Sequence, residues 1–276
     1  GFGSYGRESP VKFWEVETGQ IARVLMIPAC RYIQSLAYSP DGKIVLLGCM
    51  DGTVRFYGSV SYEPLRVLSG CSDIDYSQVA FSSDGKSLAY ATYAGQVAGW
   101  QVDSLDPPLL LEGTLLPSGS SASFTWSADG SQLAMVRVDD ACVWNTASGK
   151  RLREFKVQGI ERCTAWSADG KLLATRSYQP TATEPNEVRL WDVASGKLLH
   201  KFDLPGMGLA WSPSGSLLAA GTEGGVAIFD PATRTILRTL SGHKGPVLHL
   251  AWSSDGKMLA GGGKASEGCL WDVESG

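Results

Sequence analysis

The sequence predicts an all-β protein built from a repeated four-stranded unit, and three observations support this. A five-residue phrase (aromatic, Ser, small residue or Pro, Asp, Gly) recurs six times, and its serines lie 43, 45, 40, 45 and 41 residues apart. Short apolar runs flank each phrase, and a further run ends each unit in a large aromatic residue. No helical periodicity interrupts this order. A repeat of about 43 residues made of short strands indicates a β-propeller.

The recurring phrase has the composition of a tight turn between two strands. Asp holds such a turn through side-chain bonds to the backbone, and Gly supplies the positive φ. In the fifth copy Ser214 replaces the Asp. The copies occupy residues 38–42, 81–85, 126–130, 166–170, 211–215 and 252–256. Each copy therefore marks the first hairpin of one unit.

Two more runs complete each unit. The run 188–193 alternates large apolar residues and ends near Trp191, as expected for a third strand. A polar turn at Ser195-Gly196 follows, and residues 197–202 form a fourth run. Four strands per period is the size of one propeller blade.

The units resemble the repeats of the WD-repeat family of β-propellers over essentially the whole chain. The Trp-Asp pair of that family occurs at Trp191-Asp192 and Trp271-Asp272, the Gly-His pair at Gly242-His243, and the Asp-Gly-Thr turn at Asp51-Gly52-Thr53. The resemblance implies structural roles for Asp51, His243, Trp191, Asp192, Trp271 and Asp272.

The same resemblance implies that His243 bonds within its own blade to a Ser or Thr, the strand-end Trp and a turn Asp. Here His243 and Trp271 match, but Gly261 stands at the Ser/Thr position and Glu267 lies near the Asp position. No blade has the complete set. We therefore expect a weakened structural network and no catalytic role for His243.

We expect a single propeller domain over residues 1–276. The approximate blades are 1–27 (partial), 33–68, 77–115, 121–157, 161–204, 207–240 and 247–276, the last without its own fourth strand. This amounts to six complete three-strand sets plus a partial blade.

Two ways of closing the ring of blades remain open. A seven-bladed ring with an incomplete blade is favoured because seven is the usual number in the family. In a six-bladed ring, residues 20–27 would complete the last blade. A fragment of a longer array accounts for the ends equally well.

Charge and composition restrict the partners. The net charge is −4 with both signs mixed along the chain, so nucleic acid and anionic membranes are not expected. No apolar run approaches the length of a membrane span. The six cysteines show no metal-site spacing and no common repeat position. Thiols kept reduced favour a cytoplasmic location.

Residues with catalytic potential are sparse. Only three histidines are present, the Asp-Gly turns lack the repeated carboxylates of a calcium loop, and the glycine-rich stretch 261–264 does not open a helix. We therefore expect no enzyme activity, no metal and no cofactor, and no small-molecule ligand.

Binding is expected on the loops that differ between blades, because variable loops on a rigid scaffold are the usual place for recognition. These are the links between blades and the turns between second and third strands. The longest of these variable connections is residues 176–187, which stands where the other blades have a turn of a few residues. Arg and Tyr are frequent binding hot spots. The candidate partner-binding residues are Arg31, Tyr32, Tyr93, Arg137, Arg162, Arg176 and Tyr178.

These observations favour a non-catalytic scaffold that binds a protein or peptide partner on the loop face of the propeller. Two alternatives remain. The chain could be a regulatory or sensor region of a larger enzyme, or a propeller enzyme acting on a small molecule at the channel mouth.

Overall fold

Strands and turns account for all of the regular structure in the computed structural model. It describes residues 8–15, 17–28, 30, 32–69, 78–91, 97–104, 108–113, 123–136, 140–156, 160–178, 187–203, 208–263 and 268–276. These residues contain no helix, and their strands pair into seven antiparallel sheets. The predicted all-β class is therefore confirmed. The described strands fall into two compact units, β1–β10 and β11–β25.

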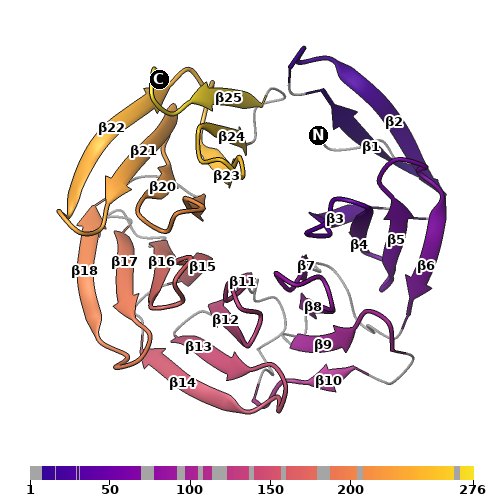
Figure 1. Ribbon diagram of the computed structural model, residues 1–276, viewed down its shortest axis with the longest axis horizontal. Helices are drawn as coiled ribbons and strands as arrows, with labels where there is room; N and C mark the ends of the chain where they lie inside the picture. Colours follow the sequence, from indigo (N-terminus) through magenta and orange to yellow (C-terminus); the bar gives the residue numbers. More distant parts are fainter. Residues whose placement is uncertain are drawn as a thin grey trace. The chain divides into compact units, whose positions relative to one another are not determined.

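The first unit holds one two-stranded and two four-stranded sheets (Figure 1). The two-stranded sheet pairs β1 (Glu8–Trp14) with β2 (Ile21–Pro28). The next sheet contains β3 (Ile33–Tyr38), β4 (Ile44–Cys49), β5 (Val54–Gly58) and β6 (Pro64–Leu68). The third contains β7 (Gln78–Phe81), β8 (Ser87–Ala91), β9 (Val97–Gln101) and β10 (Leu109–Leu110).

The second unit holds three four-stranded sheets and one three-stranded sheet. The first contains β11 (Ser123–Trp126), β12 (Gln132–Val136), β13 (Asp140–Asn145) and β14 (Arg151–Lys156). The second contains β15 (Ile160–Trp166), β16 (Leu172–Tyr178), β17 (Glu187–Asp192) and β18 (Leu198–Asp203). The third contains β19 (Leu209–Trp211), β20 (Leu218–Gly221), β21 (Gly225–Asp230) and β22 (Thr235–Ser241). The last contains β23 (Val247–Trp252), β24 (Met258–Gly263) and β25 (Cys269–Asp272).

Within each unit the full sheets are consecutive propeller blades. The strands of a blade follow chain order from the first strand outward (Figure 1). The first strands of neighbouring blades contact one another, β3 with β7 and, in the second unit, β11, β15, β19 and β23 in succession. This arrangement confirms the propeller fold. Its sheets match the expected six sets of at least three strands plus a partial blade.

The hydrophobic cores lie between neighbouring blades. One cluster joins Leu190 and Phe202 of the β15–β18 blade to Leu218 and Phe229 of the β19–β22 blade. Equivalent clusters occur at the other interfaces inside each unit. The second strand of a blade is covered on both faces, and every residue of β20 is buried. Both faces of these strands are therefore buried, and their residues do not alternate between buried and exposed positions, as in other sheets packed on both sides.

The phrase tryptophans of three blades of the second unit connect each of these blades to the one before it. The indole N–H of Trp166 donates to the carbonyl of Thr125 at 3.1 Å, and that of Trp211 to Ala165 at 3.0 Å. Trp252 donates to Ala210 at 3.0 Å. The acceptor is always the residue before the phrase in the preceding blade. These tryptophans therefore add directional bonds to the packing.

Arginines in the last strands of four sheets connect each of these sheets to the one after it. Arg66 donates to the carbonyls of Val102 and Ser104 at 2.7 and 3.0 Å. Arg153 reaches the carbonyl of Ala194 at 3.0 Å. Arg238 donates to the carbonyls of Val273 (2.7 Å) and Glu274. Arg23 makes a different contact, with its guanidinium 5.0 Å from the ring centre of Tyr62. In every case the target is the turn that follows the third strand of the next blade.

A β-bulge sets the position of these arginines. In five sheets the last strand carries one extra residue opposite the end of the strand before it. The arginine directly follows that extra residue, as Arg153 follows Leu152 and Arg238 follows Leu237. A bulge bends the strand and re-aims a side chain. His200 occupies the equivalent position in β18 and packs against Phe202, with ring centres 4.3 Å apart.

Candidate functional site

Antiparallel pairing sorts the connections of each blade onto two ends. One end, here called the constant end, holds the turns between first and second strands and between third and fourth strands. The other, here called the variable end, holds the turns between second and third strands and the links between blades. Most described connections of the constant end use the same hydrogen bonds, and the fifth copy of the phrase differs because Ser212 Oγ lies 3.1 Å from Ser214 Oγ.

The first turn of the constant end is held by a Ser-Asp pair. Ser167 Oγ donates to Asp169 Oδ1 at 2.7 Å and accepts the N–H of Leu172 at 2.9 Å. Asp169 Oδ1 also accepts the N–H of Lys171 at 3.1 Å. Gly170 follows with a φ of 71°, a conformation that favours glycine. The same arrangement occurs at Ser39, Ser82, Ser127 and Ser253.

The turn carboxylates are held in their charged form. The hydroxyl of Ser167 donates to Asp169 and, with backbone N–H groups, holds the pKa of that carboxyl below its ordinary value. The same cause lowers the pKa of Asp41, Asp84, Asp129 and Asp255. A carboxyl with a lowered pKa is a poor general base or acid near neutral pH. The pattern indicates a structural function for these groups.

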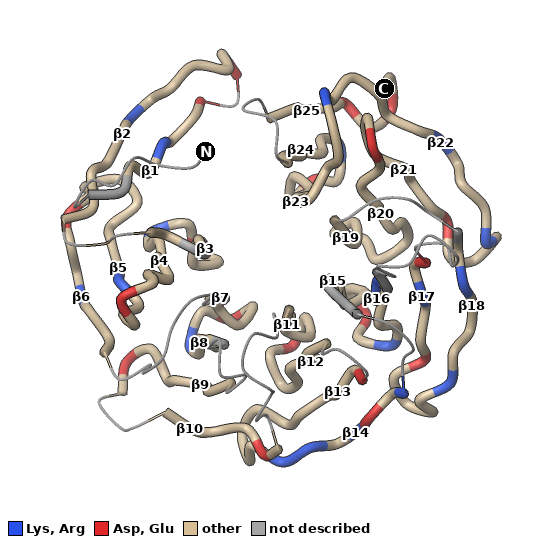
Figure 2. The backbone as a smooth tube through the Cα atoms, turned by 180° about the vertical axis from the view of Figure 1, so that it is seen from behind, with Lys and Arg blue, Asp and Glu red and all other residues tan. Residues whose placement is uncertain are grey.

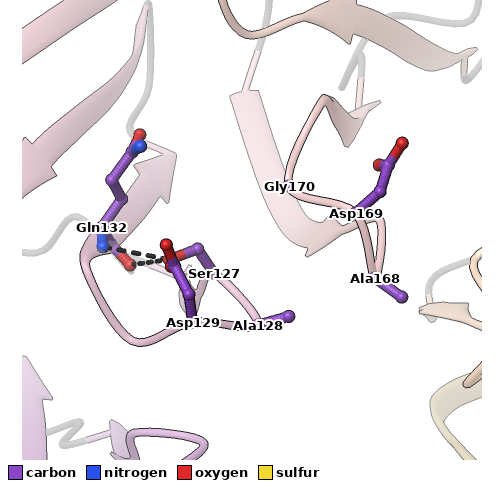
Figure 3. A pocket seen from close by; sticks show the side chains of 7 residues that line it. All are labelled: Ser127, Ala128, Asp129, Gln132, Ala168, Asp169 and Gly170. Carbon is purple, nitrogen blue, oxygen red and sulfur yellow. Dashed lines mark hydrogen bonds between the residues drawn. The ribbon is translucent and has the colours of Figure 1, made fainter.

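A pocket of about 390 Å³ lies between two such turns in the second unit (Figure 3). Ser127, Asp129 and Gln132 line one side, and Asp169 and Gly170 lie on the other. Asp129 already accepts hydrogen bonds from Ser127 (2.6 Å) and Ser131 (2.8 Å). Because both carboxylates are engaged in their own turns, the pocket is a by-product of two repeated turns.

The second turn of the constant end uses the residue after the strand-end aromatic. Asp192 Oδ1 accepts the N–H and the hydroxyl of Ser195 at 2.7 and 2.5 Å. Asp272 accepts the equivalent groups of Ser275 at 2.7 and 2.9 Å, and Asn145 caps its turn in the same way. Hydrogen bonds from Ser195 lower the pKa of Asp192. The expected structural roles of Asp192 and Asp272 rest on these contacts.

The described part of the variable end begins with the turn before β5. Asp51 Oδ1 accepts the N–H and hydroxyl of Thr53 at 3.0 and 2.5 Å. Arg55 pairs with Asp51 Oδ2 at 2.6 Å and donates to the carbonyl of Pro28 at 2.5 Å. Arg55 thereby ties this turn to the end of β2, and the structural role expected for Asp51 rests on this set.

Tyr32 is the candidate binding residue whose side chain the structure places in solvent. It lies in the link before β3 at the variable end, and 37% of its surface is exposed. Its backbone carbonyl accepts the N–H of Met50 at 3.0 Å. The backbone is therefore fixed to the neighbouring turn while the phenol ring faces outward.

Five other candidates fall wholly or partly outside the described residues. Arg31, Tyr93 and Arg137 lie outside them. Arg162 lies at a β-bulge in β15, and Tyr178 ends β16, but their side chains are outside the described part. A binding role for these five residues stays a prediction.

Arg176 does not lie in a surface loop. The insertion was expected to start there, but β16 runs through Tyr178, and only 1% of the surface of Arg176 is exposed. The reason is that β16 is a second strand, covered on both faces by neighbouring blades. Arg176 pairs in register with Cys163 and Val188. In this structure a partner could not touch its side chain directly.

A charged cluster beside the insertion was not anticipated. Glu187 opens β17, and its carboxylate contacts Arg189 Nε at 3.1 Å and Lys201 Nζ at 3.2 Å. The side chain of Arg189 is largely buried, whereas that of Lys201 is half exposed. The signal available in the sequence was the Glu-x-Arg spacing on one face of a strand. The cluster fixes the strand edge next to the insertion.

His243 lies in the link between β22 and β23 and is buried. Its Nδ1 is 2.8 Å from the carbonyl of Gly245, and its buried Nε2 has no hydrogen-bond partner within the described residues. The position expected to hold a Ser or Thr is Gly261, and the indole of Trp271 donates to the carbonyl of Ser241 at 2.7 Å. In the β15–β18 blade, Trp191 instead donates to Thr175 Oγ1 at 3.0 Å.

The described residues contain no group of three or more His, Cys, Asp or Glu side chains that could hold a metal ion. Nor do they include a helix that could cross a membrane. Figure 2 shows both signs of charge interspersed along the described strands and turns of each unit. The absence of a metal, a cofactor and a nucleic-acid partner stays a prediction from the sequence.

Comparison with known proteins agrees with the repeat geometry. The family described as "WD domain, G-beta repeat" matches residues 23–58 and 234–272. Each segment contains the last strand of one sheet and the first three strands of the next, β2 to β5 and β22 to β25. These matches and the blade geometry support the predicted WD-repeat β-propeller family. Such propellers are in general protein-interaction scaffolds and are generally not enzymes.

Several curated proteins are similar to this propeller. Telomerase protein component 1 of Rattus norvegicus is 24% identical over 79% of the chain, which spans 8% of that protein. The periodic tryptophan protein 2 homolog of Schizosaccharomyces pombe is 26% identical over 78% of the chain and 29% of its own length. WD repeat-containing protein slp1 of the same yeast is 22% identical over 75% of the chain and 41% of its own length. The chain thus spans less than half of each of these relatives.

Proposed function

We propose that this WD-repeat propeller is a non-catalytic scaffold that binds a protein or peptide partner through its variable end. One observation carries the proposal. Five of the six first turns of the constant end repeat one set of Ser-Asp bonds. The two fully described turns between second and third strands at the variable end, 50–53 and 222–224, differ in length and bonding. Recognition needs surfaces that differ from site to site, and a rigid scaffold that holds such loops provides them.

Described residues of three kinds are available at that end. Tyr32 offers an exposed aromatic ring, Glu223 and Lys244 are exposed charges in the second unit, and the Asp51–Arg55 pair forms a fixed turn. Arg31, Tyr93, Arg137, Arg162 and Tyr178 extend the proposed surface. Arg176 is proposed as a support beneath it, because it is buried in β16.

The test compares the two ends of the same molecule. Immobilised propeller is incubated with lysate, and captured proteins are quantified by mass spectrometry for wild type, Tyr32→Ala, Lys244→Glu and Lys171→Ala. Lys171 is a matched control because it lies on the constant end with 78% of its side chain exposed. A specific partner should be lost from the first two variants and retained by the third. Equal loss from Lys171→Ala, with all variants folded by circular dichroism, would place recognition elsewhere.

The alternative hypotheses about function predict different experimental results. If the chain is a regulatory region of a larger enzyme, the captured partner will be a catalytic domain, and the sequenced parent gene will encode one. An enzyme acting on a small molecule would turn over substrate as the isolated propeller. Binding of RNA in a filter assay, at a salt concentration where the Lys244→Glu variant does not bind, would replace a protein partner by a nucleic acid.

A cytoplasmic location is part of the proposal. Cys30, Cys49, Cys142, Cys163 and Cys269 form no disulfide in the described residues, as is typical of a reducing compartment. Imaging of a fluorescent fusion to the parent protein tests this, and a nuclear or secreted signal would contradict it.

A further inference from the structure

Two cysteines that are distant in the sequence meet in the first unit. Cys30 lies in the link between β2 and β3, and Cys49 is the last residue of β4. Their sulfur atoms are 2.7 Å apart, although the residues are 19 positions apart in the chain. Both side chains are 0% exposed. The separation of these sulfurs is short for a non-bonded contact and close to what a disulfide requires.

Two other cysteine sulfurs face oxygen atoms. Cys142 Sγ lies 3.9 Å from Asp140 Oδ1, and Cys269 Sγ lies 3.8 Å from the carbonyl of Gly242. Cys30 and Cys49, in contrast, are two thiols whose sulfur atoms the fold brings into contact.

The surroundings hold this pair in place. Both cysteines belong to a core cluster that includes Val11 and Ile27 of the two-stranded sheet and Leu47 of the first full blade. Arg55 bridges the same two sheets through its bond to the carbonyl of Pro28. Forming a bond between the sulfurs would thus need only a small movement of two side chains that are already packed together.

The local electrostatics distinguish the two thiols. A hydrogen bond with Cys49 stabilises the Cys30 thiolate and lowers the pKa of Cys30, and the positive charge of Arg55 adds to this against the effect of burial. The same contact and burial raise the pKa of Cys49. Cys30 is therefore the nucleophile of the pair, because the thiolate is the reactive form.

We propose that Cys30 and Cys49 form a modification site, a dithiol that a low-molecular-weight disulfide such as oxidised glutathione converts reversibly into an intramolecular disulfide. This inference is independent of the proposed binding function.

The reaction balances as two thiol–disulfide exchanges. The Cys30 thiolate attacks one sulfur of oxidised glutathione, which forms a mixed disulfide and releases one glutathione thiolate. Cys49 then loses its proton and attacks the Cys30 sulfur, which releases the second glutathione. The protein thiols lose two electrons and two protons, and the glutathione disulfide gains them. Because both sulfurs are buried, the first step requires local opening of the link.

The disulfide would cross-link the segment that follows the two-stranded sheet to the β3–β6 blade. The two-stranded sheet is the smallest in the structure, and isolated two-stranded sheets are marginally stable. A cross-link that closes a loop of this length stabilises mainly by constraining the unfolded chain. Oxidation is therefore expected to raise the melting temperature of the propeller, by about 5 °C.

The test uses the wild-type protein in buffers with increasing ratios of oxidised to reduced glutathione. After acid quenching and alkylation, tryptic mass spectrometry should show residues 24–31 cross-linked to residues 44–55. Two alkylatable thiols should be lost, and dithiothreitol should restore them. Cys142→Ser should behave like wild type, whereas Cys49→Ala should give no cross-link and only a glutathione adduct on Cys30.

The wild-type experiment decides the matter even if a variant fails to fold. The proposal is overturned if both thiols stay alkylatable in excess oxidised glutathione when the protein is incubated to equilibrium. It is also overturned if the glutathione adduct on Cys30 persists in wild type, or if cross-links to other cysteines form equally well.

Discussion

The buried hydrogen bond between Trp191 and Thr175 provides a test of how the blades are stabilised. The indole N–H of Trp191 donates to Thr175 Oγ1 at 3.0 Å, and both side chains are buried. Trp191 also packs on Phe155 of the preceding blade, with ring centres 5.6 Å apart. A double-mutant cycle of Trp191→Phe and Thr175→Val separates the bond from the packing.

The expected losses of unfolding free energy follow from the polar groups that each substitution leaves without a partner. Thr175→Val keeps the shape but leaves a buried N–H unpaired, at a cost of about 1–3 kcal/mol. Trp191→Phe unpairs the hydroxyl and leaves a small cavity beside Phe155, at a cost of about 2–3 kcal/mol. The double variant removes both polar partners. It should therefore be less destabilised than the sum of the single variants by about 1–2 kcal/mol.

Urea unfolding followed by circular dichroism and tryptophan fluorescence measures all four proteins. The control pairs Thr175→Val with Trp271→Phe, since the indole of Trp271 bonds to a backbone carbonyl in another blade. This second cycle should be additive. Additivity of the Trp191 and Thr175 changes to within about 0.5 kcal/mol would refute the reasoning.

Three other changes test features of the repeat. His200→Arg should let β18 reach the turn at 231–234, as the other arginines do, and raise the melting temperature by about 1–2 °C, whereas His200→Lys should not. Gly261→Thr should destabilise by about 1–3 kcal/mol in urea, because its Cβ would lie 2.6 Å from the ring of Trp271; unchanged stability would show that the ring moves freely. Ser214→Asp should raise the melting temperature at pH 7. Since the equivalent carboxyls have lowered pKa values, that gain is present above the unfolded pKa and should vanish as the pH falls through the folded one; a gain that persists at pH 2 would contradict this.

Much of the blade could be predicted because the local signals agree with one another. The phrase around Ser167 combines a turn-forming Asp, a Gly with positive φ and flanking apolar runs, and the structure places all three as expected. The strand-end aromatic before Asp192 likewise marked the third strand.

What the sequence could not show depends on contacts between blades. Arg176 looked like the start of a polar loop, yet a second strand covered on both faces buries it. The roles of Arg66 and Arg238 became visible only with the bulge register, because that register decides which side chain reaches the next blade. The meeting of Cys30 and Cys49 depends on a link whose path no local pattern specifies.

The opposite directions of the tryptophan and arginine bonds have a consequence for truncation and synthesis. On a ribosome, the blades that contain Trp166, Trp211 and Trp252 each emerge after the carbonyl that the tryptophan bonds, so each of these blades can dock once it is synthesised. Removing a blade from the C-terminal side would leave a surface guanidinium to bond with water. Removing one from the N-terminal side would take away the carbonyl acceptor of the indole N–H in the next blade, so shortened versions should be made by trimming the end that is synthesised last.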